Sequence, residues 1–191
     1  MVIVKLVRDK DHYKGNHVMN DDYIWNLLRY IKYNKGSNDI RDDFRHIGGH
    51  GLDYHNIDHA YDNIMKIKKY WNNVNSKHKI IHYVVSLDYD RADNLEDAIK
   101  CGELCITYFK NKCRQCIYAI HEMEHEGGKY HIHIVVNPVS YKNGNLMGHW
   151  MNNVCEFVNW VKIALNLHNW EINNITENDI EKHYHLNVIN D

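Results

Sequence analysis

Two histidines, His131 and His133, lie one residue apart in the segment KYHIHIVVNPVSYKNGN, residues 129–145. The apolar residues around them predict a β-strand, in which side chains two residues apart point to the same face of a sheet. Both imidazoles therefore project together, and Ile132 and Ile134 project to the other face. Two adjacent imidazoles repel when both are charged, so the neutral form is favoured. Neutral imidazoles that share a face are ligands for a divalent cation.

A third histidine, His121, lies near the end of the strand predicted just before this one. Pairing of the two strands can bring His121 opposite His131 or His133. Three imidazoles on one face would leave open positions on Mg²⁺ or Mn²⁺ for phosphate oxygens and water. The pair is also compatible with two half-buried surface histidines, because the chain has 16 histidines in all. However, polar residues in a core-like strand are costly unless they are used, which favours a metal site.

The periodicity of apolar residues predicts the elements that must position these side chains. Strands are predicted at residues 1–7, 79–89, 114–123 and 129–141, and helices at 21–33, 56–71, 94–109 and 154–165. This order predicts an α+β fold, an antiparallel sheet covered by helices in an HUH-endonuclease-like sandwich. We expect one domain over residues 1–191, in which 169–191 form a polar C-terminal extension.

Glycines mark two of the predicted connections. Gly127 and Gly128 are expected to turn the hairpin between the last two strands. Residues 47–56, IGGHGLDYHN, are predicted as a glycine-rich loop, either mobile over the active site or simply solvated.

The charge balance excludes a globally basic nucleic-acid-binding protein. With 23 basic and 25 acidic side chains, the formal net charge is −2 when the histidines are neutral. DNA contacts therefore need a local basic patch or a metal. The cations expected near DNA include Lys32, Lys35, Arg41 and Arg45. No apolar run approaches membrane-spanning length, and we expect a cytoplasmic, bacterial protein without membrane insertion.

The residues carry an ordered set of three motifs that resembles a known family. HIHIVVNPVSYKNGN, residues 131–145, resembles the third motif of the relaxases of plasmids and conjugative elements, which belong to the HUH endonuclease superfamily. HYVVSLDYD, residues 82–90, resembles the strand before that motif. LLRYIKYNKGS, residues 27–37, resembles the first motif, a helix that carries a tyrosine. The similarity is strongest to the P-type mobilisation relaxases and extends to about residue 165.

The resemblance implies an enzyme that nicks single-stranded DNA at the origin of transfer and initiates mobilisation. On the matched positions, Tyr30 would be the nucleophile and would form a 5′-phosphotyrosyl link; Tyr33 is the second choice. At 100° per residue Tyr30 lies at the edge of the apolar stripe of its helix, whereas Tyr33 lies opposite. From the residues alone, ordinary packing of an aromatic side chain is the favoured explanation of Tyr30, and the resemblance is what favours a catalytic role.

The resemblance also implies a divalent metal, Mg²⁺ or Mn²⁺, held by His121, His131 and His133. A metal beside a phenol, whose ordinary pKa is about 10, can activate it at neutral pH. The family has an acidic residue soon after the first histidine, and the gap to His131 is longer here. Glu124 and His125 therefore remain alternatives for the third ligand.

The implied partners are the single-stranded DNA of the origin of transfer with an adjacent hairpin, accessory relaxosome proteins and a coupling protein. Asn137 is assigned as a DNA contact, with a supporting role behind the metal ligands or a strand-end turn as alternatives. Two other functions remain open. Rolling-circle replication initiators share the chemistry, but their paired histidines precede the tyrosine, whereas Tyr30 comes first here. A non-catalytic DNA-binding module with a degenerate metal site is the other alternative.

Overall fold

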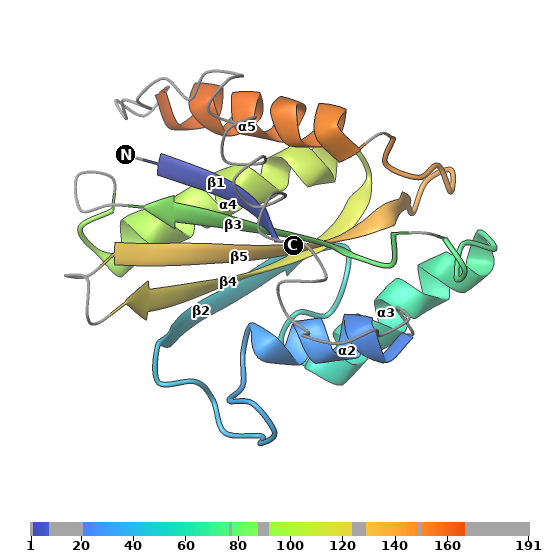
Figure 1. The fold of residues 1–191 in the computed structure, drawn as a ribbon, viewed down its shortest axis with the longest axis horizontal. Helices are drawn as coiled ribbons and strands as arrows, with labels where there is room; N and C mark the ends of the chain where they lie inside the picture. Colours follow the sequence, from blue (N-terminus) through green and yellow to red (C-terminus); the bar gives the residue numbers. More distant parts are fainter. Residues whose placement is uncertain are drawn as a thin grey trace, which may run out of the picture.

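The computed structural model describes residues 2–7, 21–76, 78–87, 92–123, 129–148 and 150–166. These residues form a five-stranded antiparallel sheet with the strand order β1-β3-β5-β4-β2, flanked by four helices (Figure 1). The elements in chain order are β1 (Val2–Val7), α2 (Asp21–Tyr30), β2 (Phe44–His50), α3 (Ile57–Tyr70), β3 (Ile81–Leu87), α4 (Leu95–Asn111), β4 (Arg114–Met123), β5 (Lys129–Ser140) and α5 (Trp150–Asn166). The predicted α+β class is confirmed. No helix in the described ranges is long and apolar enough to span a membrane.

The sheet is buried on both faces, because α4 and α5 cover one face and α2 and α3 cover the other (Figure 1). Ile132 and Ile134 of the central strand β5 face the first pair of helices, where they pack in one core with Phe109 and Phe157. The alternate residues of β5 face the second pair, and Val135 packs there in a core with Ile24, Leu28 and Ile64. The two-residue alternation predicted for this strand is therefore confirmed.

The glycine-rich segment differs from the prediction, because residues 47–50 belong to strand β2 and not to a loop. Glycine is depleted in strands, and this low propensity hid the strand in the sequence. The sheet requires glycine at these positions. A Cβ atom on Gly48 would lie 2.4 Å from a ring carbon of Tyr118, and one on Gly49 would lie 2.8 Å from the carbonyl oxygen of Cys116. A mobile loop at residues 47–50 is thus ruled out.

The first helix is shorter than predicted and ends at Tyr30. The chain then turns back on itself, and Tyr33 pairs with Ile40 in an isolated antiparallel bridge. The Arg29 guanidinium donates a hydrogen bond of 2.5 Å to the carbonyl of Ser37, and this bond stabilises the turn. Tyr30 and Tyr33 are therefore no longer on one helix. The predicted hairpin turn at Gly127 and Gly128 and the extension 169–191 lie outside the described residues.

Replacing Gly48 with Ala should lower the free energy of unfolding by about 1–3 kcal/mol, the usual range for overpacking in a core. The Tyr118 ring cannot move away, because Gly102 lies against its other edge and its hydroxyl lies 3.2 Å from Nε2 of His46. Urea denaturation measures the change. Gly148→Ala is the control, since a Cβ there meets nothing within 4 Å. Equal stability of the two variants would contradict the packing argument.

Candidate active site

Strand register places the predicted histidines together on the face covered by α2 and α3. His121 on β4 lies directly opposite His131 on β5, and His133 follows two residues later, opposite Ala119. The ring centroids of His121 and His133 are 4.4 Å apart. Both of these rings are buried, whereas His131 is half-buried. The shared face expected from the spacing is therefore confirmed.

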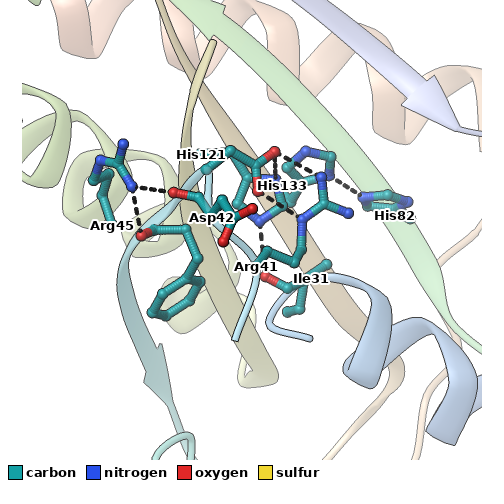
Figure 2. Close-up of polar contacts among 9 residues, drawn as sticks. Ile31, Arg41, Asp42, Arg45, His82, His121 and His133 are labelled. Atoms are coloured by element: carbon teal, nitrogen blue, oxygen red, sulfur yellow. Dashed lines mark hydrogen bonds and ion pairs between the residues drawn. The ribbon is translucent and has the colours of Figure 1, made fainter. Parts of the chain in front are cut away.

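The structure adds a fourth histidine, His82 on β3, which was not among the residues predicted from the sequence. Its side chain is only 2% exposed, and its Nε2 lies 3.0 Å from Nδ1 of His133 (Figure 2). The sequence did contain a signal, because His82 interrupts the otherwise apolar strand KIIHYVVSL in the way that His133 interrupts β5. The two strands lie far apart in the sequence, and only their pairing in the sheet brings these histidines together.

A backbone carbonyl fixes the proton of His121. Its Nε2 lies 2.8 Å from the carbonyl oxygen of Ile31, which can only accept a hydrogen bond (Figure 2). The neutral ring therefore carries its proton on Nε2 and a lone pair on Nδ1, and Nδ1 lies 3.9 Å from Oδ2 of Asp43. Because Ile31 follows Tyr30 directly, this bond ties the end of α2 to the histidines on the sheet.

The buried histidines are held neutral. Burial lowers the pKa of His121, although the Ile31 carbonyl and the Asp43 carboxylate act in the opposite direction. The pKa of His133 falls well below its usual value, first through burial and then through repulsion by His82, His121 and other positive groups. Neutral imidazole is the form that binds cations.

Tyr30 is the tyrosine that the structure brings to this cluster. Its ring lies edge-on to His133 at a centroid distance of 5.8 Å and to His82 at 6.3 Å, and its side chain is 38% exposed. Tyr33 has different neighbours, because the cations of Arg29 and Lys32 lie 5.0 and 5.3 Å from its ring centroid. Tyr30 is thus both close to the imidazoles and accessible from solvent.

An arginine and a carboxylate complete the rim of the site. The Arg41 guanidinium lies 5.3 Å from the centroid of the Tyr30 ring. It donates to both carboxylate oxygens of Asp43, at 2.8 and 2.6 Å. This contact raises the pKa of Arg41 and lowers that of Asp43, so both groups stay charged at neutral pH. Arg41, predicted as a DNA contact, therefore also lies at the predicted nucleophile.

The other predicted cations, Lys32, Lys35 and Arg45, have different surroundings from Arg41. Arg45 pairs with Glu122 at 2.5 Å, so part of its charge is neutralised. It also donates to the carbonyl of Asp42 (Figure 2). Lys32 donates to the carbonyl of His55 at 2.9 Å. Lys35 is exposed on the turn that follows α2.

The prediction that Asn137 contacts DNA is wrong. The side chain is completely buried within β5. Its amide donates to Oε1 of Gln115 at 2.9 Å, and its Oδ1 accepts from the backbone N–H of Val139 at 3.1 Å. These bonds leave the amide satisfied inside the sheet, so its role is structural.

Comparison with known families decides the assignment of the chain. Residues 31–170 match the model of the relaxase family described as MobA/VirD2-like, nuclease domain. The chain belongs to this relaxase family. The matched range includes the four histidines of the cluster, His82, His121, His131 and His133, and begins one residue after Tyr30. Searches of the curated proteins and of the solved structures gave no significant match. Family membership supports a DNA-nicking relaxase that acts on single-stranded DNA.

Relaxases are generally metal-dependent, and the donor chemistry of the site fits a divalent cation. His121 and His133 are neutral, and each makes a hydrogen bond through one ring nitrogen, the arrangement typical of metal-binding histidines. Within the described ranges, however, no three His, Cys, Asp or Glu side chains converge as a ready-formed metal site. The alternative ligands Glu124 and His125 lie outside those ranges.

The buried histidines make the stability of this relaxase depend on pH. The unfolded chain binds a proton at His133 near the usual pKa of about 6.5, whereas the folded chain binds it only at lower pH. The free energy of unfolding should therefore fall as the pH drops below 6.5, by at most about 1.4 kcal/mol per pH unit for this group. Urea denaturation at pH 7 and pH 5 should show a smaller fall for His133→Gln than for the wild type. The exposed His78→Gln is the control, and an equal fall in all three proteins would contradict the account.

Proposed function

We propose that this relaxase is a metal-dependent, strand-specific endonuclease that nicks the origin of transfer of a mobile element and links itself to the DNA through Tyr30. One observation supports the proposal above the others: the accessible ring of Tyr30 lies against the buried neutral histidines at 5.8 Å from His133. A solvent-accessible tyrosine whose ring packs against neutral imidazoles is suited to attack a phosphodiester bound there.

The proposed step exchanges one phosphate ester for another. The Tyr30 oxygen attacks the phosphorus atom, and its proton passes to solvent. The bond from phosphorus to the 3′ oxygen of the preceding nucleotide breaks, and that oxygen gains a proton. The products are a free 3′ hydroxyl and a 5′-phosphotyrosyl link. Because the ester bond is conserved, the cut strand can later be rejoined by the reverse step.

His121, His131 and His133 would hold the Mg²⁺ or Mn²⁺ ion, with Glu124 or His125 as alternatives for the third ligand. When bound, the cation would neutralise the charge on the oxygens of the scissile phosphate. The chain itself keeps the imidazoles neutral by burial and orients His121 through the Ile31 carbonyl. The orientation of His121, and with it metal binding, would therefore depend on the position of the Ile31 carbonyl at the end of α2.

Arg41 is suited to stabilise the negative charge that develops between the Tyr30 oxygen and the phosphate. Its guanidinium is fixed by two hydrogen bonds to Asp43 and lies over the Tyr30 ring. A cation that is already oriented needs no rearrangement when charge develops, which makes such groups effective in catalysis. Lys35 and Lys32 lie on the next turn of the chain and extend positive charge away from the site.

The proposed substrate is single-stranded DNA with an adjacent hairpin, bound in the bacterial cytoplasm. The net charge of −2 limits non-specific affinity, so accessory relaxosome proteins would assist DNA binding, and a coupling protein would receive the linked strand.

Replacing Tyr30 with Phe should abolish the covalent protein–DNA adduct and leave DNA binding within about threefold. The substitution removes the attacking oxygen and keeps the ring that packs against His133. The assay mixes protein, Mn²⁺ and single strands tiled from the DNA that flanks its gene, and detects denaturant-stable adducts on a gel. Tyr33→Phe is the matched control and should keep the adduct. An adduct that survives Tyr30→Phe would refute the assignment of the nucleophile.

Replacing Arg41 with Gln should slow single-turnover cleavage by about 100-fold, as expected for loss of one oriented charge-stabilising group. Arg45→Gln is the matched control, since Arg45 lies on the same segment but pairs with Glu122. We expect Arg45→Gln to change the rate by less than about threefold. Rapid-quench kinetics at saturating DNA measures both rates, and equal losses would show that Arg41 acts only through general DNA binding.

A further inference from the structure

His82 lies beside the proposed ligands and has no place in the predicted ligand set. It is buried on β3 directly opposite Val135 of β5, so it is a diagonal neighbour of His133 on the same face. The two rings stack with centroids 5.2 Å apart and an interplanar angle of 27°, and a hydrogen bond of 3.0 Å joins His82 Nε2 to His133 Nδ1. The register of two paired strands thus fixes this contact, and no loop conformation is involved.

A hydrogen bond between two imidazole nitrogens needs an N–H on one ring and a lone pair on the other. Both rings are buried, where a charge is costly, so each ring carries one proton. Two arrangements are then possible. If His82 donates, the proton of His133 is on Nε2, and that nitrogen cannot bind a cation. If His133 donates from Nδ1, its Nε2 keeps a lone pair.

We propose that His82 is a positioning residue, which accepts a hydrogen bond from Nδ1–H of His133 and thereby keeps Nε2 of His133 available to a divalent cation. The inference rests on the metal site of the proposed function. The Ile31 carbonyl lies 2.8 Å from Nε2 of His121 and keeps the proton of that ring on Nε2. His82 would fix the proton of His133 in the same way, but on Nδ1. His121 and His133 would then each have one ring nitrogen anchored in the protein and the other left for the cation.

The position of Tyr30 gives the ring orientation a second consequence. The Tyr30 ring meets His82 and His133 edge-on at interplanar angles of 73° and 75°. Both imidazoles therefore form the surface against which the proposed nucleophile rests. A change in the ring plane of His133 would therefore alter both the direction of its proposed metal-binding nitrogen and the surface against which the Tyr30 ring packs.

The first test is the affinity for Mn²⁺, measured by calorimetric titration of the full chain without DNA. His82→Phe keeps an aromatic ring and removes the acceptor, and we expect the Kd to rise about 10- to 100-fold. His82→Gln restores an acceptor near the position of Nε2 and should stay within about threefold of the wild type. The matched control is His46→Phe, which removes a histidine hydrogen-bonded to Tyr118 elsewhere on the sheet and should leave the Kd unchanged.

The second test observes the proton directly and needs neither metal nor DNA. Long-range ¹H–¹⁵N spectra of the wild-type chain, with the His133 signals assigned through His133→Gln, should show His133 protonated on Nδ1 and unprotonated on Nε2. A proton on Nε2 of His133 would overturn the proposal, even if His82→Phe failed to fold. Mn²⁺ binding that His82→Phe leaves unchanged would overturn the role of His82 alone. A wild-type chain that binds no Mn²⁺ would overturn the metal site of the proposed function as well.

Discussion

The hydrogen bond from His121 to the carbonyl of Ile31 joins the two parts of the molecule on which the site depends. His121 belongs to the sheet, and Ile31 is the first residue after α2. Tyr30, the last residue of that helix, is placed by the same contact against His133. Helices α2 and α3 pack over one face of the sheet, with Ile24 and Leu28 in the core between them. This packing holds the end of α2 in place against the histidines.

Burial determines the chemistry of the site through the protonation of its groups. The imidazoles of His121 and His133 lie between the sheet and the end of α2, where a positive charge is poorly solvated, so they remain neutral at physiological pH. Arg41 and Asp43 lie at the rim, where both keep their charges and balance one another. The site thus separates neutral donors inside from a fixed cation outside, an arrangement suited to bind a metal and a phosphate side by side.

Local patterns in the sequence revealed the parts of the site that depend on one strand or one helix. The spacing of His131 and His133 predicts their shared face, because alternation within a strand is a local property. His121 followed from pairing with the adjacent strand. His82 did not, because its partner is 51 residues away and the strand order β3-β5-β4 is set by tertiary packing. The residue types of HxH and of the tyrosine motif identified the family without any of this geometry.

Tertiary packing also explains the predictions that failed. Gly48 and Gly49 suggested a loop, yet the Tyr118 ring and the Cys116 carbonyl approach these positions so closely that only glycine allows the strand. Asn137 suggested a surface contact, yet its amide is bonded to Gln115 inside the sheet. A small or polar residue can be required in the interior of a protein as well as on its surface. The sequence does not distinguish a buried position from an exposed one when the residue that packs against it lies on a distant strand.

The central claim is that Tyr30 and the histidine cluster form one nicking site. Mass-spectrometric mapping of the peptide that remains linked to DNA after reaction with Mn²⁺ tests this claim most directly. The account predicts that the nucleotide is attached to Tyr30, with a 5′ phosphate in the link. Attachment to a tyrosine remote from the cluster, such as Tyr70 on α3, would contradict it.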